Sequence, residues 1–168
     1  ALEHGVACNT AGGSHHAGRM QGAGFCTFND VGVAAHVLLA DGEISNALVL
    51  DLDVHQGDGT ADIFSDDIRV FTASVHADRN YPHVKQISDY DLGLPDGMED
   101  LAYLKTLALV LEELRDRITP DIVFYNAGVD VHRDDRLGRL SLTDHGIEQR
   151  ERMVFAHFRQ RGIPVCGV

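Results

Sequence analysis

The sequence predicts an α/β fold in which helices pack on both faces of a mostly parallel β-sheet. Short runs that are almost wholly apolar recur along the chain, as they do in strands buried on both faces of a parallel sheet. Segments with helical periodicity separate these runs, and such alternation is typical of α/β domains. The 168 residues, 44% of them hydrophobic, are enough for one domain with a substantial core.

The expected elements follow one another in a regular order. A first helix, with an asparagine as its N-cap, is followed by strands that enclose a second helix, and a third helix precedes the last strand. The helices are expected at residues 29–39, 101–117 and 143–161, and the strands at 47–52, 69–74, 121–126 and 163–168. Two polar stretches, 89–91 and 133–139, are expected to be solvated loops.

Composition excludes several functional classes. The 14 Lys and Arg residues face 26 Asp and Glu residues, so the net charge is −12, and direct nucleic-acid binding, which depends on basic side chains, is not expected. No apolar run approaches the roughly 20 residues of a membrane span. Three cysteines without a CxxC pair favour a reducing, cytoplasmic setting and no thiolate zinc site. The oligomeric state is left open.

A dense polar motif follows the first expected strand. Asp51, Asp53, His55 and Asp58 lie within eight residues, and alternation along a strand would place the first three on one side. Asp130 follows the third expected strand and reaches the same edge, where parallel sheets bind ligands. One such Asp alone would usually be a cap or turn residue. Two Asp and one His around an open position predict a catalytic zinc site, although iron or cobalt would also accept these ligands.

A tandem histidine pair, His15-His16, lies in a glycine-rich segment near the N-terminus. Such a pair alone would by default be part of a solvated loop. Here Asp51 and Asp58 remain available to orient the two imidazoles, and a carboxylate–His pair fixes the tautomer needed for proton transfer. The pair is therefore a candidate acid–base group.

Further candidates surround these two motifs. Phe25, after the flexible Gly22–Gly24 stretch, could wall an apolar channel or simply pack in the core. Tyr81 could form a second wall, and Ser74 could offer oxygen to a monovalent cation. Cys26 is expected to be a small buried hydrophobe, since no basic neighbour lowers its pKa.

Together these motifs resemble the zinc-dependent histone deacetylase superfamily, which also contains acetoin-utilisation proteins and acetylpolyamine amidohydrolases. The matching segments are GGSHHA (12–17), GAGFCTFND (22–30), DLDVHQGDGT (51–60), SVH (74–76), NAGVD (126–130) and DRLGRLSLT (135–143). They occur in the family's order along almost the whole chain and look most like class IV-type and bacterial deacetylases. The resemblance implies an arginase–deacetylase three-layer α/β/α sandwich that hydrolyses acetyl-lysine or a similar N-acyl amine.

The resemblance also implies roles for individual residues. The zinc ligands would be Asp53, His55 and Asp130. The catalytic group would be His16 paired with Asp58 as general base and acid, and His15 paired with Asp51 as electrostatic partner. The substrate would contact Gly24, Phe25 and Tyr81. A structural potassium ion would be held by Asp51, Asp53, His55, Ser74 and Val75, partly through backbone carbonyls.

Family members are about twice as long as this chain, so residues 1–168 are expected to be the central part of one deacetylase domain, incomplete at both ends. The tyrosine that polarises the substrate carbonyl in the family has no match here. We therefore expect weak or no activity from this chain alone. Alternatives are a long-chain deacylase, an acetylpolyamine amidohydrolase, and a non-catalytic module that binds metal or acyl-lysine.

Overall fold

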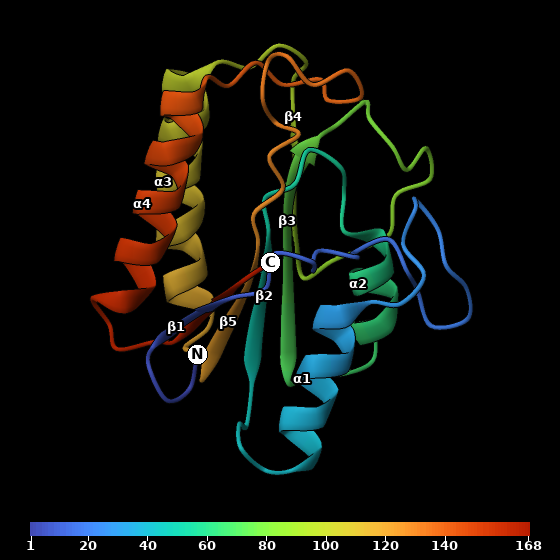
Figure 1. Cartoon of the computed structure of the whole chain (residues 1–168), viewed down its shortest axis with the longest axis vertical. Helices are drawn as coiled ribbons and strands as arrows, with labels where there is room; N and C mark the ends of the chain where they lie inside the picture. Colours follow the sequence, from blue (N-terminus) through green and yellow to red (C-terminus); the bar gives the residue numbers. More distant parts are fainter.

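One six-stranded parallel sheet organises the structure, a computed structural model that describes residues 1–168. The strand order is β1-β6-β5-β2-β3-β4. The strands are β1 (Val6–Cys8), β2 (Ala47–Asp51), β3 (Val70–Ala77), β4 (Tyr90–Leu94), β5 (Ile122–Asn126) and β6 (Val165–Gly167), and the helices are α1 (Asp30–Ala40), α2 (Asp58–Phe64), α3 (Asp100–Arg117) and α4 (Asp144–Arg159). Helices α3 and α4 lie together on one side of the sheet and α1 and α2 on the other (Figure 1), which confirms the predicted three-layer α/β/α architecture.

The central strands are continuous apolar runs because both of their faces are buried. Along β2, Leu48 and Leu50 pack into the larger core cluster, together with residues of α3 and α4. Ala47 and Val49 pack into the smaller cluster, together with residues of α1. A polar side chain at any of these positions would be buried on one side or the other.

Two strands and one helix were not expected from the sequence. The prediction that residues 89–91 form a solvated loop is wrong, because β4 begins at Tyr90 and pairs with β3 at the edge of the sheet. The apolar side chains of Tyr90, Leu92 and Leu94 alternate along this strand, as in a sheet edge with one buried face. Strand β1 has only three residues, and α2 begins inside the polar motif at Asp58. The other predicted loop, 133–139, lies outside helices and strands and is mostly exposed.

The register places the carboxyl ends of β2 and β5 side by side, while β3 continues past them to Ala77. Asp51, the last residue of β2, is paired with Ser74 of β3 and with Asn126 of β5. The loops that leave β2 and β5 therefore start next to each other at one edge of the sheet. No helix in the structure is both long enough and apolar enough to cross a membrane.

Candidate active site

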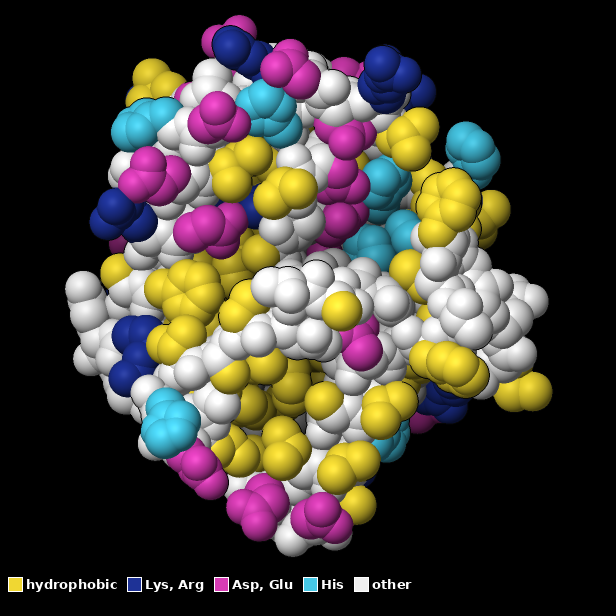
Figure 2. All heavy atoms as spheres, viewed as in Figure 1, with side chains coloured by type: hydrophobic (Ala, Val, Ile, Leu, Met, Phe, Trp, Pro, Cys, Tyr) yellow, Lys and Arg dark blue, Asp and Glu magenta, His cyan; other side chains and the backbone are white.

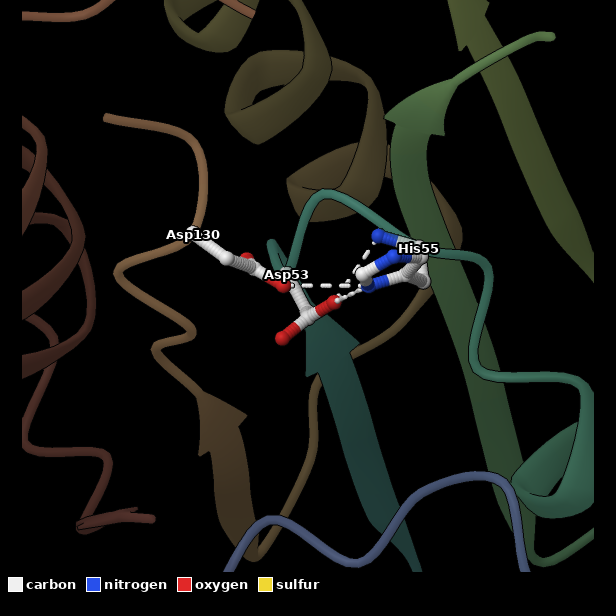
Figure 3. Close-up of side chains that lie close together, drawn as sticks. All are labelled: Asp53, His55 and Asp130. Atoms are coloured by element: carbon white, nitrogen blue, oxygen red, sulfur yellow. Dashed lines mark hydrogen bonds and ion pairs between the residues drawn. The ribbon is translucent and has the colours of Figure 1, made fainter. Parts of the chain in front are cut away.

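Two carboxylates and one imidazole converge beyond the ends of β2 and β5. Asp53 and His55 lie on the loop after β2, and Asp130 lies on the loop after β5 (Figure 3). His55 Nδ1 is 3.0 Å from Asp53 Oδ1 and 3.0 Å from Asp130 Oδ2. One potential ligand atom from each residue lies within 4.8 Å of the other two. The structure thus brings together the three residues predicted to bind metal.

Hydrogen bonds in the loop, rather than strand alternation, aim these side chains. Strand β2 ends at Asp51, so the expectation that alternation would align Asp51, Asp53 and His55 is wrong. Instead the Asp53 N–H donates to Asp51 Oδ1 (3.1 Å), and the His55 N–H donates to Asp53 Oδ1 (2.8 Å). The Val54 N–H donates to Asp130 Oδ1 at 3.0 Å, which connects the two loops and leaves Asp130 Oδ2 directed at His55.

The three residues fit a zinc ion. Carboxylate oxygen and imidazole nitrogen are both zinc ligands, and ligand atoms about 2.0–2.1 Å from a tetrahedral zinc lie roughly 3.3 Å from one another. The 3.0 Å separations of His55 Nδ1 from the two oxygens are close to this value. Two carboxylates this close also repel each other unless positive charge lies between them. The donor set and its spacing are those of a three-ligand site with room for a water or substrate oxygen.

Each histidine of the tandem pair is bonded to its own carboxylate. His15 Nδ1 donates to Asp51 Oδ2 at 2.6 Å, and His16 Nδ1 donates to Asp58 Oδ1 at 2.5 Å. The two rings lie with their centroids 4.0 Å apart. Both histidines are buried, and since each Nδ1 is engaged, each Nε2 is left for other partners. Both predicted carboxylate–His dyads are present.

Negative charge dominates the electrostatics of the site. Burial alone would lower the pKa of His15, but Asp51, with Asp53 and Asp130, outweighs burial and raises the pKa to about 9. For His55, burial again acts downward, and hydrogen bonds to Asp130 and Asp53 raise the pKa to about 10. In the metal-free protein these imidazoles therefore carry the positive charge that a metal ion would otherwise supply.

A cavity of about 660 Å³ opens onto the metal triad and the histidine pair. Its lining includes the two dyad histidines, the three metal-site residues, Gly24, Phe25 and Tyr81. The Tyr81 ring packs edge-on against His16, with centroids 4.8 Å apart. Phe25 is fully exposed and has a left-handed backbone with φ of 66°, so it lines the mouth rather than packing in the core. Acidic and histidine side chains gather in a hollow on one face of the molecule (Figure 2).

Gly24 and Cys26 lie beside this cavity. A Cβ at Gly24 would overlap the His16 ring, so only glycine allows the backbone to approach the imidazole this closely. Cys26 Sγ contacts the Gly24 carbonyl at 3.4 Å. The prediction that Cys26 is buried is wrong, since the residue is partly exposed, because it lines the cavity instead of packing in the core.

Two of the residues predicted to bind potassium, Ser74 and Val75, lie within β3, where Ser74 is paired with Asp51 of β2. The Ser74 hydroxyl is buried and contacts His76 Nδ1 at 3.0 Å and the Gly57 N–H at 3.4 Å. The Val75 side chain packs in the larger core cluster, so only its backbone carbonyl could be a ligand. The structure thus places Ser74 beside Asp51 but engages its hydroxyl with protein groups.

Three residues at the site were not singled out from the sequence. Asn126 Nδ2 donates to Asp51 Oδ1 at 3.0 Å and so supports the His15 dyad. Asn80 and Leu137 line the cavity, and Asn80 Nδ2 donates to the Leu137 carbonyl at 2.9 Å, which joins the two loops at its rim. Asn126 is the polar last residue of the buried, otherwise apolar strand β5. That position in the sequence could have identified it as a candidate site residue. Nothing in the sequence indicated the Asn80 contact.

Comparison with known sequences identifies the relatives of the chain. A family model described as histone deacetylase domain matches residues 1–168. An uncharacterized protein of Picosynechococcus sp. is 53% identical over 168 residues, covering 100% of this chain and 56% of that protein. Histone deacetylase 2 of Arabidopsis thaliana is 34% identical, covering 98% of this chain and 43% of that protein. The chain thus spans about half the length of these relatives.

Solved structures give the same result for the fold. An HDAC homologue from Aquifex aeolicus superimposes with a TM-score of 0.84 at 28% identity, covering 95% of this chain and 46% of that one. An HDAC homologue complexed with SAHA has the same TM-score, identity and coverage. Acetylpolyamine aminohydrolase from Burkholderia pseudomallei has a TM-score of 0.83 at 27% identity, covering 99% of this chain and 51% of that one. The chain belongs to the histone deacetylase family and has the α/β fold of its arginase–deacetylase superfamily.

Proposed function

We propose that this chain carries the metal and acid–base centre of a zinc-dependent deacetylase that hydrolyses acetyl-lysine or a similar N-acyl amine. One observation carries the proposal. The triad of Asp53, His55 and Asp130 lies beside two carboxylate–His dyads at one cavity. A module that only binds a ligand has no need for two oriented imidazoles beside a metal site.

Asp53, His55 and Asp130 would hold the zinc. When bound, zinc polarises the amide carbonyl and lowers the pKa of a water toward about 7. The Val54 N–H holds one oxygen of Asp130, and the His55 N–H holds the binding oxygen of Asp53. These bonds keep the ligand atoms oriented, as supporting contacts do in metal sites generally.

His16 would move the proton. Its Nδ1 is committed to Asp58, so Nε2 can accept a proton from the attacking water and return it to the leaving amine. His15 would act as an electrostatic partner, because its Nε2 lies 3.6 Å from Asp53 Oδ1 and its positive charge is held by Asp51. Gly24 permits the close approach of backbone to His16, and we assign its carbonyl to the substrate amide.

Phe25 and Tyr81 would hold the acyl chain and the stem of the amine. Both line the cavity, and their apolar surfaces suit methylene groups. Asp51 and Ser74, neighbours on adjacent strands, with the carbonyls of Asp53, His55 and Val75, would hold a potassium ion that stiffens the strand ends.

The test is zinc-dependent hydrolysis by the full 168-residue chain. With the chain in stoichiometric amount, we expect slow release of acetate from an acetyl-lysine peptide. This chain has no match for the tyrosine that polarises the substrate carbonyl in the family, and loss of one such oxyanion stabiliser typically costs about 10²–10³ in rate. Removal of zinc by a chelator and the Asp130→Ala change should both abolish it. Zinc binding without any hydrolysis would favour the non-catalytic module, and no zinc binding at the triad would refute the proposal.

A second substrate class has support of its own. A protein with net charge −12 attracts cations, and one structural neighbour is an acetylpolyamine aminohydrolase. Acetylated polyamines are therefore the alternative to acetyl-lysine peptides. Hydrolysis rates for an acetyl-lysine peptide, a long-chain acyl peptide and an acetylpolyamine, measured side by side, separate the three possibilities.

A further inference from the structure

The buried face of α4 contains an arginine in the middle of its packing stripe. Gly146, Arg150, Val154 and Phe158 follow one another at four-residue spacing and are all buried. Arg150 is fully buried. A buried guanidinium must have all its charge and donors matched to be tolerated, so its partners indicate what it does.

All five N–H donors of Arg150 are used. Nη1 donates to the carbonyls of Leu52 (3.0 Å) and Gly128 (2.9 Å). Nη2 donates to the carbonyl of Ala127 (3.0 Å) and to Glu151 Oε1 (2.6 Å), and Nε donates to the same Glu151 oxygen at 2.9 Å. Five contacts match the five donors of a guanidinium, and Glu151 balances the charge. The rigid planar fork leaves little freedom for any of these groups to shift.

The three carbonyls belong to the two loops that carry the metal-site residues. Leu52 directly precedes Asp53, and Gly128 lies two residues before Asp130. The loops also touch at this point, since a Cβ at Gly128 would overlap the Asp53 carboxylate. Arg150 therefore fixes the two loops to each other, and to α4, within one or two residues of both carboxylates.

We propose that Arg150 is a positioning residue that sets the separation of the Asp53 and Asp130 carboxylates and so the affinity of the metal site. The inference rests on the proposed function, because it concerns the same metal. Lysine at this position would keep the charge but offers a compact ammonium without the fork. Methionine would keep much of the apolar stem and no donor.

The test compares zinc affinity in the full chain, measured by competition with a chromophoric chelator, for wild type, Arg150→Met and Arg150→Lys. Val154→Ala is the matched control, because it opens a cavity on the same face of α4 and removes no hydrogen bond to either loop. Melting of each metal-free protein monitors the fold.

We expect zinc affinity to fall about 10- to 100-fold in Arg150→Met, as when contacts that orient ligands are lost, and to fall less in Arg150→Lys. In Val154→Ala we expect zinc affinity to stay within about twofold although the protein melts earlier. The visible spectrum of bound Co²⁺, which reports coordination geometry, should change only in the Arg150 variants.

Wild-type zinc affinity in a folded Arg150→Met or Arg150→Lys protein would overturn this inference alone. An equal loss of affinity in Val154→Ala at matched loss of stability would also overturn it, since the effect would then be general loosening of α4. If Arg150→Met does not fold, Arg150→Lys decides, and full affinity with an unchanged Co²⁺ spectrum counts against the inference. Absence of zinc binding in the wild-type chain would overturn the proposed function and this inference together.

Discussion

Replacing Gly128 by alanine should disable the metal site while leaving the fold in place. The nearest atoms to an added Cβ are those of the Asp53 carboxyl group, and the overlap is too close for van der Waals contact. To relieve it, the Asp53 carboxylate must move by on the order of 1 Å. Zinc tolerates deviations of only about 0.2 Å in its ligand distances. Asp53 Oδ1 moves together with the rest of the carboxylate, so it no longer serves as a ligand.

Loss of one of three protein ligands should weaken zinc binding by at least about 100-fold, or ~2.7 kcal/mol. Zinc affinity is measured by competition with a chelator, and the melting of the metal-free protein is measured in parallel. Gly167→Ala is the control. Its added Cβ would meet Phe155 Cζ at an ordinary 3.7 Å, and both changes restrict the unfolded chain in the same way. Gly128→Ala protein with the zinc affinity of the wild type would show that Asp53 is not a ligand or that the loops can separate freely.

Three further outcomes are expected. Zinc at 100 times its Kd should stabilise the chain by about 2.7 kcal/mol, seen as a rise in Tm that a chelator reverses, and no rise would contradict a folded-state metal site. In the metal-free protein the pKa of His15 is raised from 6.5 to about 9. Protonated His15 therefore contributes about 3 kcal/mol to the free energy of unfolding. This contribution is complete below pH 6.5 and is lost as the pH rises through 9. Denaturant unfolding between pH 6.5 and 9.5 should show this loss, and Asp51→Asn should remove this component. Tyr81→Ala should weaken binding of an acetyl-lysine peptide to the zinc-loaded chain about 10-fold by removing one apolar wall, and unchanged affinity by calorimetry would place the ligand elsewhere.

The layered fold could be predicted because the central strands are buried on both faces and therefore read as continuous apolar runs. The metal triad could be predicted because Asp53 and His55 are close in the sequence and Asp130 ends another such run. Strand β4 was missed because Asp91 within it and Asp89 just before it obscured the alternation of Tyr90, Leu92 and Leu94. The reason given for the convergence of Asp53 and His55 was also wrong, because the strand ends before either residue and hydrogen bonds turn the loop.

Arg150 illustrates what the sequence could not supply. A four-residue spacing with Gly146 and Val154 marks the buried face of a helix, so an arginine there was a visible anomaly. Its partners, however, are backbone carbonyls, which have the same chemistry in every residue. They form a binding site for the Arg150 guanidinium only once the loops after β2 and β5, which are distant in the sequence, lie next to each other in the fold. The same holds for the Asn80 contact with the Leu137 carbonyl.

The contact between Val54 and Asp130 spans 76 positions of the chain, and this separation has a consequence for the order of folding. Closing so long a loop costs conformational entropy that local contacts formed earlier do not offset. The Asp53–His55 half of the metal site can form early, but the Asp130 half arrives only after β2 and β5 have paired around the whole of α2, β3, β4 and α3. Tight zinc binding during refolding would therefore be a late event. Its time course would report when β2 and β5 pair.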